Sequence, residues 1–158
     1  MKPFPKRLKL ADLPTRIEKL ERFSERTGLN VYVKRDDMSG MEWSGNKIRK
    51  LEFSIQEALD RGADTLITCG GIQSNHCRAT AAAAARLGLR SCLLLRTDDP
   101  DPLLDGNYFI DKVLGADIRF ISAEDYRSRR GEVMEELAGE FERQGHKAYI
   151  IPEGASNG

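Results

Sequence analysis

The chain has 158 residues, 40% of them apolar, which is enough for one domain with a hydrophobic core and part of a second. Its 25 basic and 25 acidic residues are interspersed and give a formal net charge of zero, which argues against a basic surface for nucleic acid or lipid headgroups. No apolar run approaches the roughly 20 residues needed to span a bilayer, and the first residues lack the apolar stretch of a signal peptide. Three cysteines without metal-ligand spacing suit a reducing compartment, so we expect a cytoplasmic protein.

The first part of the chain is predicted to hold an arm, two helices and one strand. Thr15 and Glu18 have the spacing of a capping box, and Gly28 is suited to end the helix that begins there. The segment VYVKRDD alternates apolar and polar residues, as a half-buried strand does. The expected elements are an extended arm at 1–13, a helix at 14–28, a strand at 31–37, a glycine-containing loop at 38–45 and a helix at 46–63.

The rest of the chain alternates short apolar strands with longer helices. Strands are expected at 65–70, 91–96, 116–121 and 147–152, and helices at 74–88, 103–115 and 122–145. This alternation is typical of parallel βαβ units. The predicted fold class is therefore α/β, a three-layer parallel sheet with helices on both faces. The last strand runs into EGASNG with no helix after it, which indicates a truncated product or one piece of a longer protein.

The helix expected at 46–63 opens with three cations among four residues. Its buried stripe is formed by Ile48, Leu51, Ile55 and Leu59. Arg49 and Lys50 point away from this stripe and are expected to face solvent, whereas Lys47 lies at its edge and in the first helical turn. The helix dipole and partial burial both disfavour a charged amine there, and imine chemistry requires a neutral one. The alternative is a lysine whose stem covers apolar surface while its charge stays in water, and the residues alone leave both open.

A strand, two glycines and a helix start follow one another in TCGGIQSNHCRA. Such a junction presents unpaired N–H groups and a positive dipole end, so we expect an anion site that includes Gly71. It lies at the carboxyl end of a parallel strand, where open α/β sheets bind ligands. Ser74, Asn75 and His76 add a hydroxyl, an amide and an imidazole at the same place. The alternative is ordinary N-capping by Ser74 or Asn75, with His76 exposed.

Four other features are interpreted as structural. His146 follows a helix-ending glycine and is expected to contact the end of that helix. The acidic residues of 98–101 are expected in a solvated loop, because prolines interrupt them and no glycine turn accompanies them. Cys77 lies in a first helical turn, where a thiol pKa can fall, but is expected to be a small buried residue. Gly106 and Asn107, inside a predicted helix, mark a close approach of the backbone to another segment.

Taken together, SGNKIRKLEF and GADTLITCGGIQSNHCRATAAAAARLGL resemble a family of pyridoxal-phosphate enzymes. This family includes D-cysteine desulfhydrase and 1-aminocyclopropane-1-carboxylate deaminase and shares the fold of the tryptophan synthase β chain. The likeness runs from about Leu8 to the last residue. It implies that Lys47 forms the imine with pyridoxal phosphate and moves the Cα proton, and that Asn75 hydrogen-bonds the ring hydroxyl of the cofactor. It also implies that Ser74 lies beside the substrate, with roles in carboxylate binding and proton transfer.

The same resemblance implies a substrate site and a reaction. The N–H groups after Gly71 would hold the carboxylate of a small amino acid, with His76 beside them. Deaminases of the family tend to carry glutamine where this chain has His76, so the reaction implied is α,β-elimination of D-cysteine to pyruvate, sulfide and ammonia. Deamination of 1-aminocyclopropane-1-carboxylate and sulfo-lysis of L-cysteate are the alternatives. Ser44 and Ala155 depart from the family, many of whose members have glycine at these positions.

The resemblance also implies a division of the chain. Residues 1–49 would form an arm and the edge of a large cofactor domain, and residues 50–158 a small α/β domain, in an enzyme that is a homodimer at full length. The glycine-rich phosphate loop, the partner of the pyridine nitrogen and the active-site tyrosines are expected to lie outside this chain. We therefore expect weak binding of pyridoxal phosphate by these residues alone. An inactive fragment or a non-catalytic α/β binding module is the alternative of another class.

Overall fold

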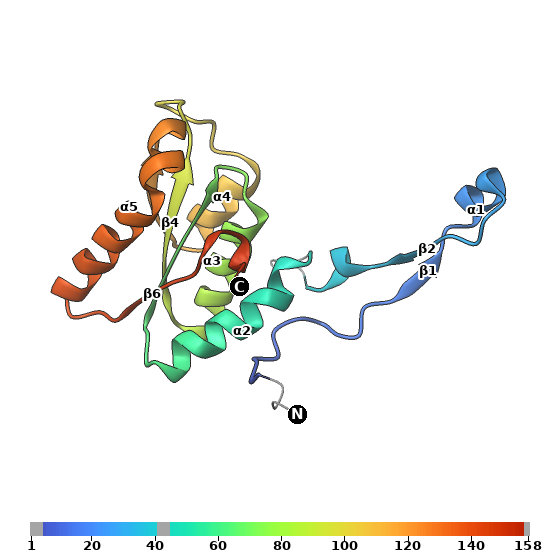
Figure 1. Cartoon of the computed structure of the whole chain (residues 1–158), viewed down its shortest axis with the longest axis horizontal. Helices are drawn as coiled ribbons and strands as arrows, with labels where there is room; N and C mark the ends of the chain where they lie inside the picture. Colours follow the sequence, from blue (N-terminus) through green and yellow to red (C-terminus); the bar gives the residue numbers. More distant parts are fainter. Residues whose placement is uncertain (1–4, 41–44, 157–158) are drawn as a thin grey trace.

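The computed structural model of the protein describes residues 5–40 and 45–156. Figure 1 shows an α/β body and a long arm that projects from it. The arm holds β1 (Ile17–Lys19), α1 (Glu21–Thr27), β2 (Tyr32–Lys34) and the 3₁₀ turn η1 (Asp36–Met38). The body holds α2 (Lys47–Asp60), β3 (Thr65–Gly71), α3 (Asn75–Leu87), β4 (Arg90–Arg96), α4 (Gly106–Val113), β5 (Asp117–Ile121), α5 (Ala123–Arg143), β6 (Ala148–Ile150) and η2 (Glu153–Ala155). None of the helices described is long and apolar enough to cross a membrane.

The body is built on a four-stranded parallel sheet in the order β5–β4–β3–β6. Successive residues of a strand point to opposite faces, so Leu66 packs with α2 and α3 while Ile67 packs with α5. In β4, Leu93 and Leu95 likewise pack with residues of α3 and α4. Helices cover both faces, which explains why the central strands are almost wholly buried. The predicted three-layer α/β fold is confirmed.

The arm differs from the single helix predicted for its first half. Its first segment is strand β1, which pairs with antiparallel β2, and only α1 is helical. Thr15 does not cap a helix, because its hydroxyl donates to the carboxylate of Asp36 at 2.8 Å, and α1 begins without a side-chain cap. The capping-box prediction from Thr15 and Glu18 was therefore wrong, whereas the strand predicted within 31–37 is confirmed as β2.

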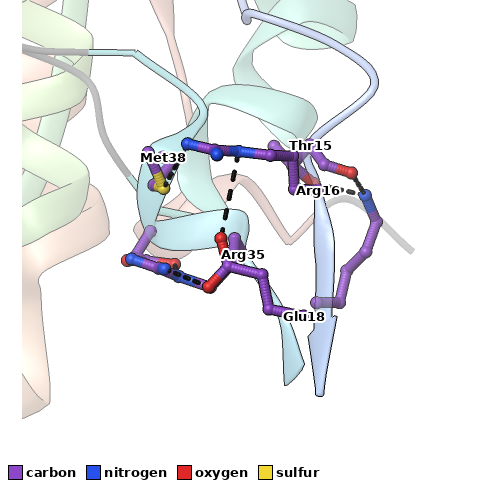
Figure 2. Close-up of polar contacts among 7 residues, drawn as sticks. Thr15, Arg16, Glu18, Arg35 and Met38 are labelled. Carbon is purple, nitrogen blue, oxygen red and sulfur yellow. Dashed lines mark hydrogen bonds and ion pairs between the residues drawn. The ribbon is translucent and has the colours of Figure 1, made fainter. Parts of the chain in front are cut away.

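Charged side chains hold the two strands of the arm together. Arg35, which follows β2, donates to Glu18 of β1 at 2.6 Å (Figure 2). The backbone N–H of Arg35 also donates to the carbonyl of Arg16 at 2.9 Å, and the amine of Lys34 contacts Thr15. An isolated pair of strands is marginally stable in water, so these side-chain and backbone contacts help to stabilise the two-stranded sheet of the arm.

Helix α2 joins the arm to the body. The carboxylate of Glu52, which is 1% exposed, accepts hydrogen bonds from the backbone N–H groups of Leu10 at 2.7 Å and Ala11 at 2.9 Å. The same carboxylate pairs with Arg7 at 2.8 Å. One buried side chain of α2 therefore holds three groups of the arm.

Arg49 forms a second link between α2 and the arm. It donates to both oxygens of Asp36, at 2.9 and 2.8 Å, and this pairing lowers the pKa of the Asp36 carboxyl. The expectation that Arg49 faces only solvent was therefore wrong, because its partner lies in the arm and not on the helix itself. Lys50 is exposed, as expected, and donates to Ser156 at 3.1 Å.

Replacing Glu52 with alanine is expected to lower the free energy of unfolding by about 3 kcal/mol, because Leu10, Ala11 and Arg7 lose a buried acceptor. Urea denaturation of Glu52→Ala and the wild type measures the change. The matched control is Glu57→Ala on the same helix, where an exposed pair with Arg61 is expected to contribute under about 1 kcal/mol. Equal losses in the two variants would show that Glu52 does not anchor the arm.

Candidate active site

The turn between β3 and α3 forms the centre of the candidate site. Ser74 caps α3 in an extended conformation, and its Oγ accepts from the N–H of Cys77 at 3.2 Å. A Cβ on Gly70 would lie 2.7 Å from the Cβ of Ser74 and 2.8 Å from the sulfur of Cys77, so only glycine fits there. The N-capping proposed for Ser74 is confirmed. Because the cap uses a lone pair of Oγ, the hydroxyl proton can still be donated to a ligand.

His76 is 3% exposed, so the alternative in which it faces solvent was wrong. Its Nε2 lies 2.8 Å from Oγ1 of Thr68, whose hydroxyl donates to the carbonyl of Ile151 at 2.8 Å. The single hydroxyl proton of Thr68 is donated to Ile151. The hydrogen bond between Thr68 and His76 must therefore use a proton on Nε2 of His76. Nδ1 is then a buried acceptor without a hydrogen-bond partner among the described residues. Burial, together with the charges of Lys47 and Lys50, lowers the pKa of His76 to about 4, and the ring is neutral at pH 7.

Lys47 is the first residue of α2 and is half-buried, as predicted from its place beside the apolar stripe. The stripe itself is confirmed, since Ile48, Leu51 and Ile55 are fully buried. Helices α2 and α3 pack in one apolar cluster, and the charge of Lys47 acts on His76 in the first turn of α3. The start of α2 and the start of α3 therefore lie at the same edge of the sheet.

Two residues that sequence reasoning did not assign to the site, Gln73 and Asn107, contact it. Asn107 of α4 donates from Nδ2 to Oδ1 of Asn75 at 3.0 Å and to the carbonyl of Gln73 at 2.8 Å. A Cβ on Gly106 would collide with the side chain of Gln73, which confirms the close approach predicted at Gly106 and Asn107. The sequence signal was the Gly-Asn pair, but the segment it approaches depends on how α4 packs against α3.

The remaining candidates are structural, as predicted. Burial raises the pKa of the Cys77 thiol to about 12. The backbone N–H of His146 donates to the carbonyl of Phe141 at 3.0 Å, and the two rings pack at the end of α5. Asp98 lies in an exposed loop and accepts from the N–H of Ala123 at the start of α5, at 2.8 Å.

A cavity of about 720 Å³ lies between the arm, α2 and the segment after β6. Its lining includes Lys6, Phe53 and Ala155 but none of the turn residues between β3 and α3. Lys50 and Ser156, which are hydrogen-bonded to each other, also line this cavity. This cavity therefore lies apart from the turn that holds Ser74, Asn75 and His76.

Comparison with known proteins identifies the family. The family model described as pyridoxal-phosphate-dependent enzyme matches residues 8–157. This chain belongs to that family. It is 47% identical over 163 residues to the mitochondrial bifunctional D-cysteine desulfhydrase/1-aminocyclopropane-1-carboxylate deaminase of Arabidopsis thaliana, a match that covers 99% of the chain and 41% of that protein. It is 43% identical over 158 residues to the D-cysteine desulfhydrase of Klebsiella pneumoniae, over 98% of the chain and 47% of that protein.

A solved structure supports the same assignment. The crystal structure of an ACC deaminase homologue superposes with a TM-score of 0.87 at 42% identity, covering 98% of this chain and 46% of that one. The fold is thus the tryptophan synthase β-like fold of pyridoxal-phosphate enzymes. The chain spans less than half the length of the curated relatives it matches. Of the two departures from the family, Ser44 lies outside the described residues, and Ala155 adopts a left-handed φ of 49°, which glycine favours.

The donors of the site fit pyridoxal phosphate, the cofactor of this family. The cofactor offers an aldehyde carbon, a ring oxygen that accepts hydrogen bonds and a phosphate. The amine of Lys47 suits the aldehyde, and the exposed carboxamide of Asn75 can donate to the ring oxygen. The N–H groups at the start of α3 suit an anionic group.

Two buried groups make stability depend on pH in opposite directions. The pKa of His76 is lowered from 6.5 to about 4, so its contribution to stability is complete above pH 6.5 and is lost as the pH falls toward 4. Asp111 of α4 is fully buried, and neither of its carboxyl oxygens has a hydrogen-bond partner in the described parts of the chain. Burial raises the pKa of Asp111 from 3.8 to about 7, so its contribution is complete below pH 3.8 and is lost as the pH rises toward 7.

Between pH 6.5 and 4, His76 is protonated mainly in the unfolded state. The wild type is therefore expected to lose roughly 3 kcal/mol of unfolding free energy relative to His76→Gln, at about 1.4 kcal/mol for each pH unit. Urea denaturation at successive pH values measures this difference. Asp111→Asn is the matched control, and its difference from the wild type is expected to change with the opposite sign. A difference for His76→Gln that does not change with pH would contradict a buried, neutral His76.

Proposed function

We propose that this chain is the amino-terminal part of a lyase that catalyses α,β-elimination of D-cysteine, or of a similar small amino acid, to pyruvate, sulfide and ammonia. The observation that carries the proposal is that the charge of Lys47, the first residue of α2, acts on His76, which follows Ser74 and Asn75 at the start of α3. The names of the Arabidopsis and Klebsiella relatives support D-cysteine as the substrate.

In this proposal Lys47 binds the cofactor through Nζ and moves the proton of the substrate Cα. When bound, pyridoxal phosphate supplies an electron sink for the charge left at Cα. Asn75 donates to the ring hydroxyl oxygen.

The turn before α3 holds the substrate. The hydroxyl of Ser74 donates to the substrate carboxylate and takes part in proton transfer. The N–H of Ser74 closes the turn onto the carbonyl of Gly71 at 2.9 Å, so other N–H groups after Gly71 hold the carboxylate. His76 belongs to the substrate site beside this turn, with Nε2 engaged by Thr68.

The proposal extends to organisation and location. Residues 1–49 are an arm and the edge of a large cofactor domain, and residues 50–158 are a small α/β domain. The arm that projects from the body in Figure 1 supports this division. The full-length protein is a cytoplasmic homodimer.

A second candidate function is deamination of 1-aminocyclopropane-1-carboxylate, which the bifunctional name of the Arabidopsis relative favours. Sulfo-lysis of L-cysteate is a third, with the same proton transfer at Cα and sulfite as the leaving group. An inactive fragment or a non-catalytic α/β module that binds carboxylates is the candidate of another class. These candidates share the fold and differ in what leaves the substrate, so product analysis separates them.

The full-length protein is expected to release sulfide from D-cysteine faster than it releases ammonia from 1-aminocyclopropane-1-carboxylate. The reason is the residue after Asn75, which is His76 and not the glutamine typical of deaminases. Initial rates of sulfide and ammonia formation, measured side by side, test this order. Faster ammonia release from the cyclopropane substrate would favour the second candidate, and no product from either substrate would favour the non-catalytic one.

Lys47→Ala in the full-length protein is expected to abolish the absorbance of the lysine-bound cofactor and to lower elimination at least roughly a hundredfold, because the group that moves the Cα proton is lost. A pyridoxal phosphate titration followed by absorbance, together with the sulfide assay, measures both effects. Lys9→Ala, at an exposed position of the arm, is the control and should leave the spectrum unchanged. A normal spectrum in Lys47→Ala would remove Lys47 from the proposed role.

A further inference from the structure

The side chain of Asn107, the second residue of α4, is bonded on every polar atom to the start of α3. Its Nδ2 donates to the carbonyl of Gln73 at 2.8 Å and to Oδ1 of Asn75 at 3.0 Å. Its Oδ1 accepts from Nη1 of Arg78 at 2.9 Å. The carboxamide of Asn107 thus links the turn that precedes α3 to the first helical turn of α3.

These partners determine which way both carboxamides face. A guanidinium can only donate, so the atom of Asn107 that meets Arg78 must be oxygen. A backbone carbonyl can only accept, so the atom that meets Gln73 must be nitrogen. The same nitrogen meets Asn75, which must therefore turn its Oδ1 inward. The Nδ2 group of Asn75, a pure donor, is left on the exposed side of the residue.

A second set of contacts fixes α4 in this position. The backbone N–H of Asn107 donates to Oε1 of Gln73 at 2.8 Å, and Nε2 of Gln73 donates to Oδ1 of Asp105 at 2.8 Å. Gly106 has a φ of 50°, and a side chain there would collide with Gln73. The start of α4 is thus held against the turn by both side chain and backbone, which makes the orientation of Asn107 a property of the fold.

We propose that Asn107 is a positioning residue, which orients the carboxamide of Asn75 so that Nδ2, and not Oδ1, faces the ring hydroxyl oxygen of pyridoxal phosphate. This inference rests on the proposed function, in which Asn75 donates to that oxygen. An ionised ring oxygen only accepts hydrogen bonds, so an inverted carboxamide would place two acceptors face to face. Correct polarity at Asn75 therefore requires the donor at Asn107.

Two substitutions at Asn107 test the inference in the full-length protein. Asn107→Asp keeps the shape of the side chain but can only accept hydrogen bonds, so Asn75 is expected to turn Nδ2 inward. Asn107→Leu removes the donor without adding charge. Both variants, like Asn75→Ala, are expected to bind pyridoxal phosphate about 10- to 100-fold more weakly, as measured by absorbance titration. Asn30→Asp, at an exposed position of the arm, is the matched control and should bind normally.

A measurement without cofactor gives an independent readout. In NMR spectra of the unmodified chain, the two Nδ2 protons of Asn107 are expected to exchange with water more slowly than those of Asn30, because each is hydrogen-bonded. The Nδ2 protons of Asn75 are expected to exchange as fast as those of Asn30. In Asn107→Asp, the protons of Asn75 should become protected.

The outcomes separate this inference from the proposed function. Fast exchange of the Asn107 protons in the unmodified chain would overturn the inference, whether or not the variants fold. Weak cofactor binding in Asn75→Ala, with normal binding in both Asn107 variants, would overturn the positioning role and leave the proposed function intact. Normal binding in Asn75→Ala would overturn both.

Discussion

The close contact between the end of β3 and the start of α3 decides where the polar groups of the site lie. Gly70 leaves no room for a side chain, and Ser74 and Cys77 pack against the strand at distances that a Cβ would prevent. β3 is an inner strand of a parallel sheet, so this turn emerges at the carboxyl edge. Asn107 at the start of α4 bonds to this turn, and the charge of Lys47 at the start of α2 acts on His76. The starts of α3 and α4 therefore meet at this turn.

Buried hydrogen bonds limit what each polar group of the site can do. Thr68 donates to Ile151, and His76 is thereby left with a protonated Nε2 and a bare Nδ1. Asn107 donates to Asn75, which leaves that residue with a donor on its exposed side. In both cases the partner that sets the polarity comes from a segment distant in the chain, 83 residues from Thr68 and 32 from Asn75. The sheet and the helix packing thus determine which atoms of His76 and Asn75 can donate a hydrogen bond, which the residue types alone leave open.

Helix α2 connects this site to the arm. The charge of its first residue, Lys47, acts on His76 at the start of α3, while Arg49 pairs with Asp36 of the arm and Glu52 accepts from the arm backbone. Consecutive turns of one helix therefore carry the amine of the site and the contacts that hold the arm. Leu10 also packs in the apolar cluster of α2 and α3, so apolar contacts and these polar links together hold the segment before β1 against the body.

The sequence by itself determined the alternation of strands and helices, the buried stripe of α2 and the cap at Ser74, because each depends on neighbouring residues and on regular periodicity. It failed in the arm, where Thr15 and Glu18 match a capping box but bond instead to Asp36 and Arg35. The burial of His76 and the place of Asn107 were also decided only by the tertiary structure. Local patterns specify which backbone conformation a segment prefers, whereas the partner of a polar side chain depends on which distant segment the fold brings beside it.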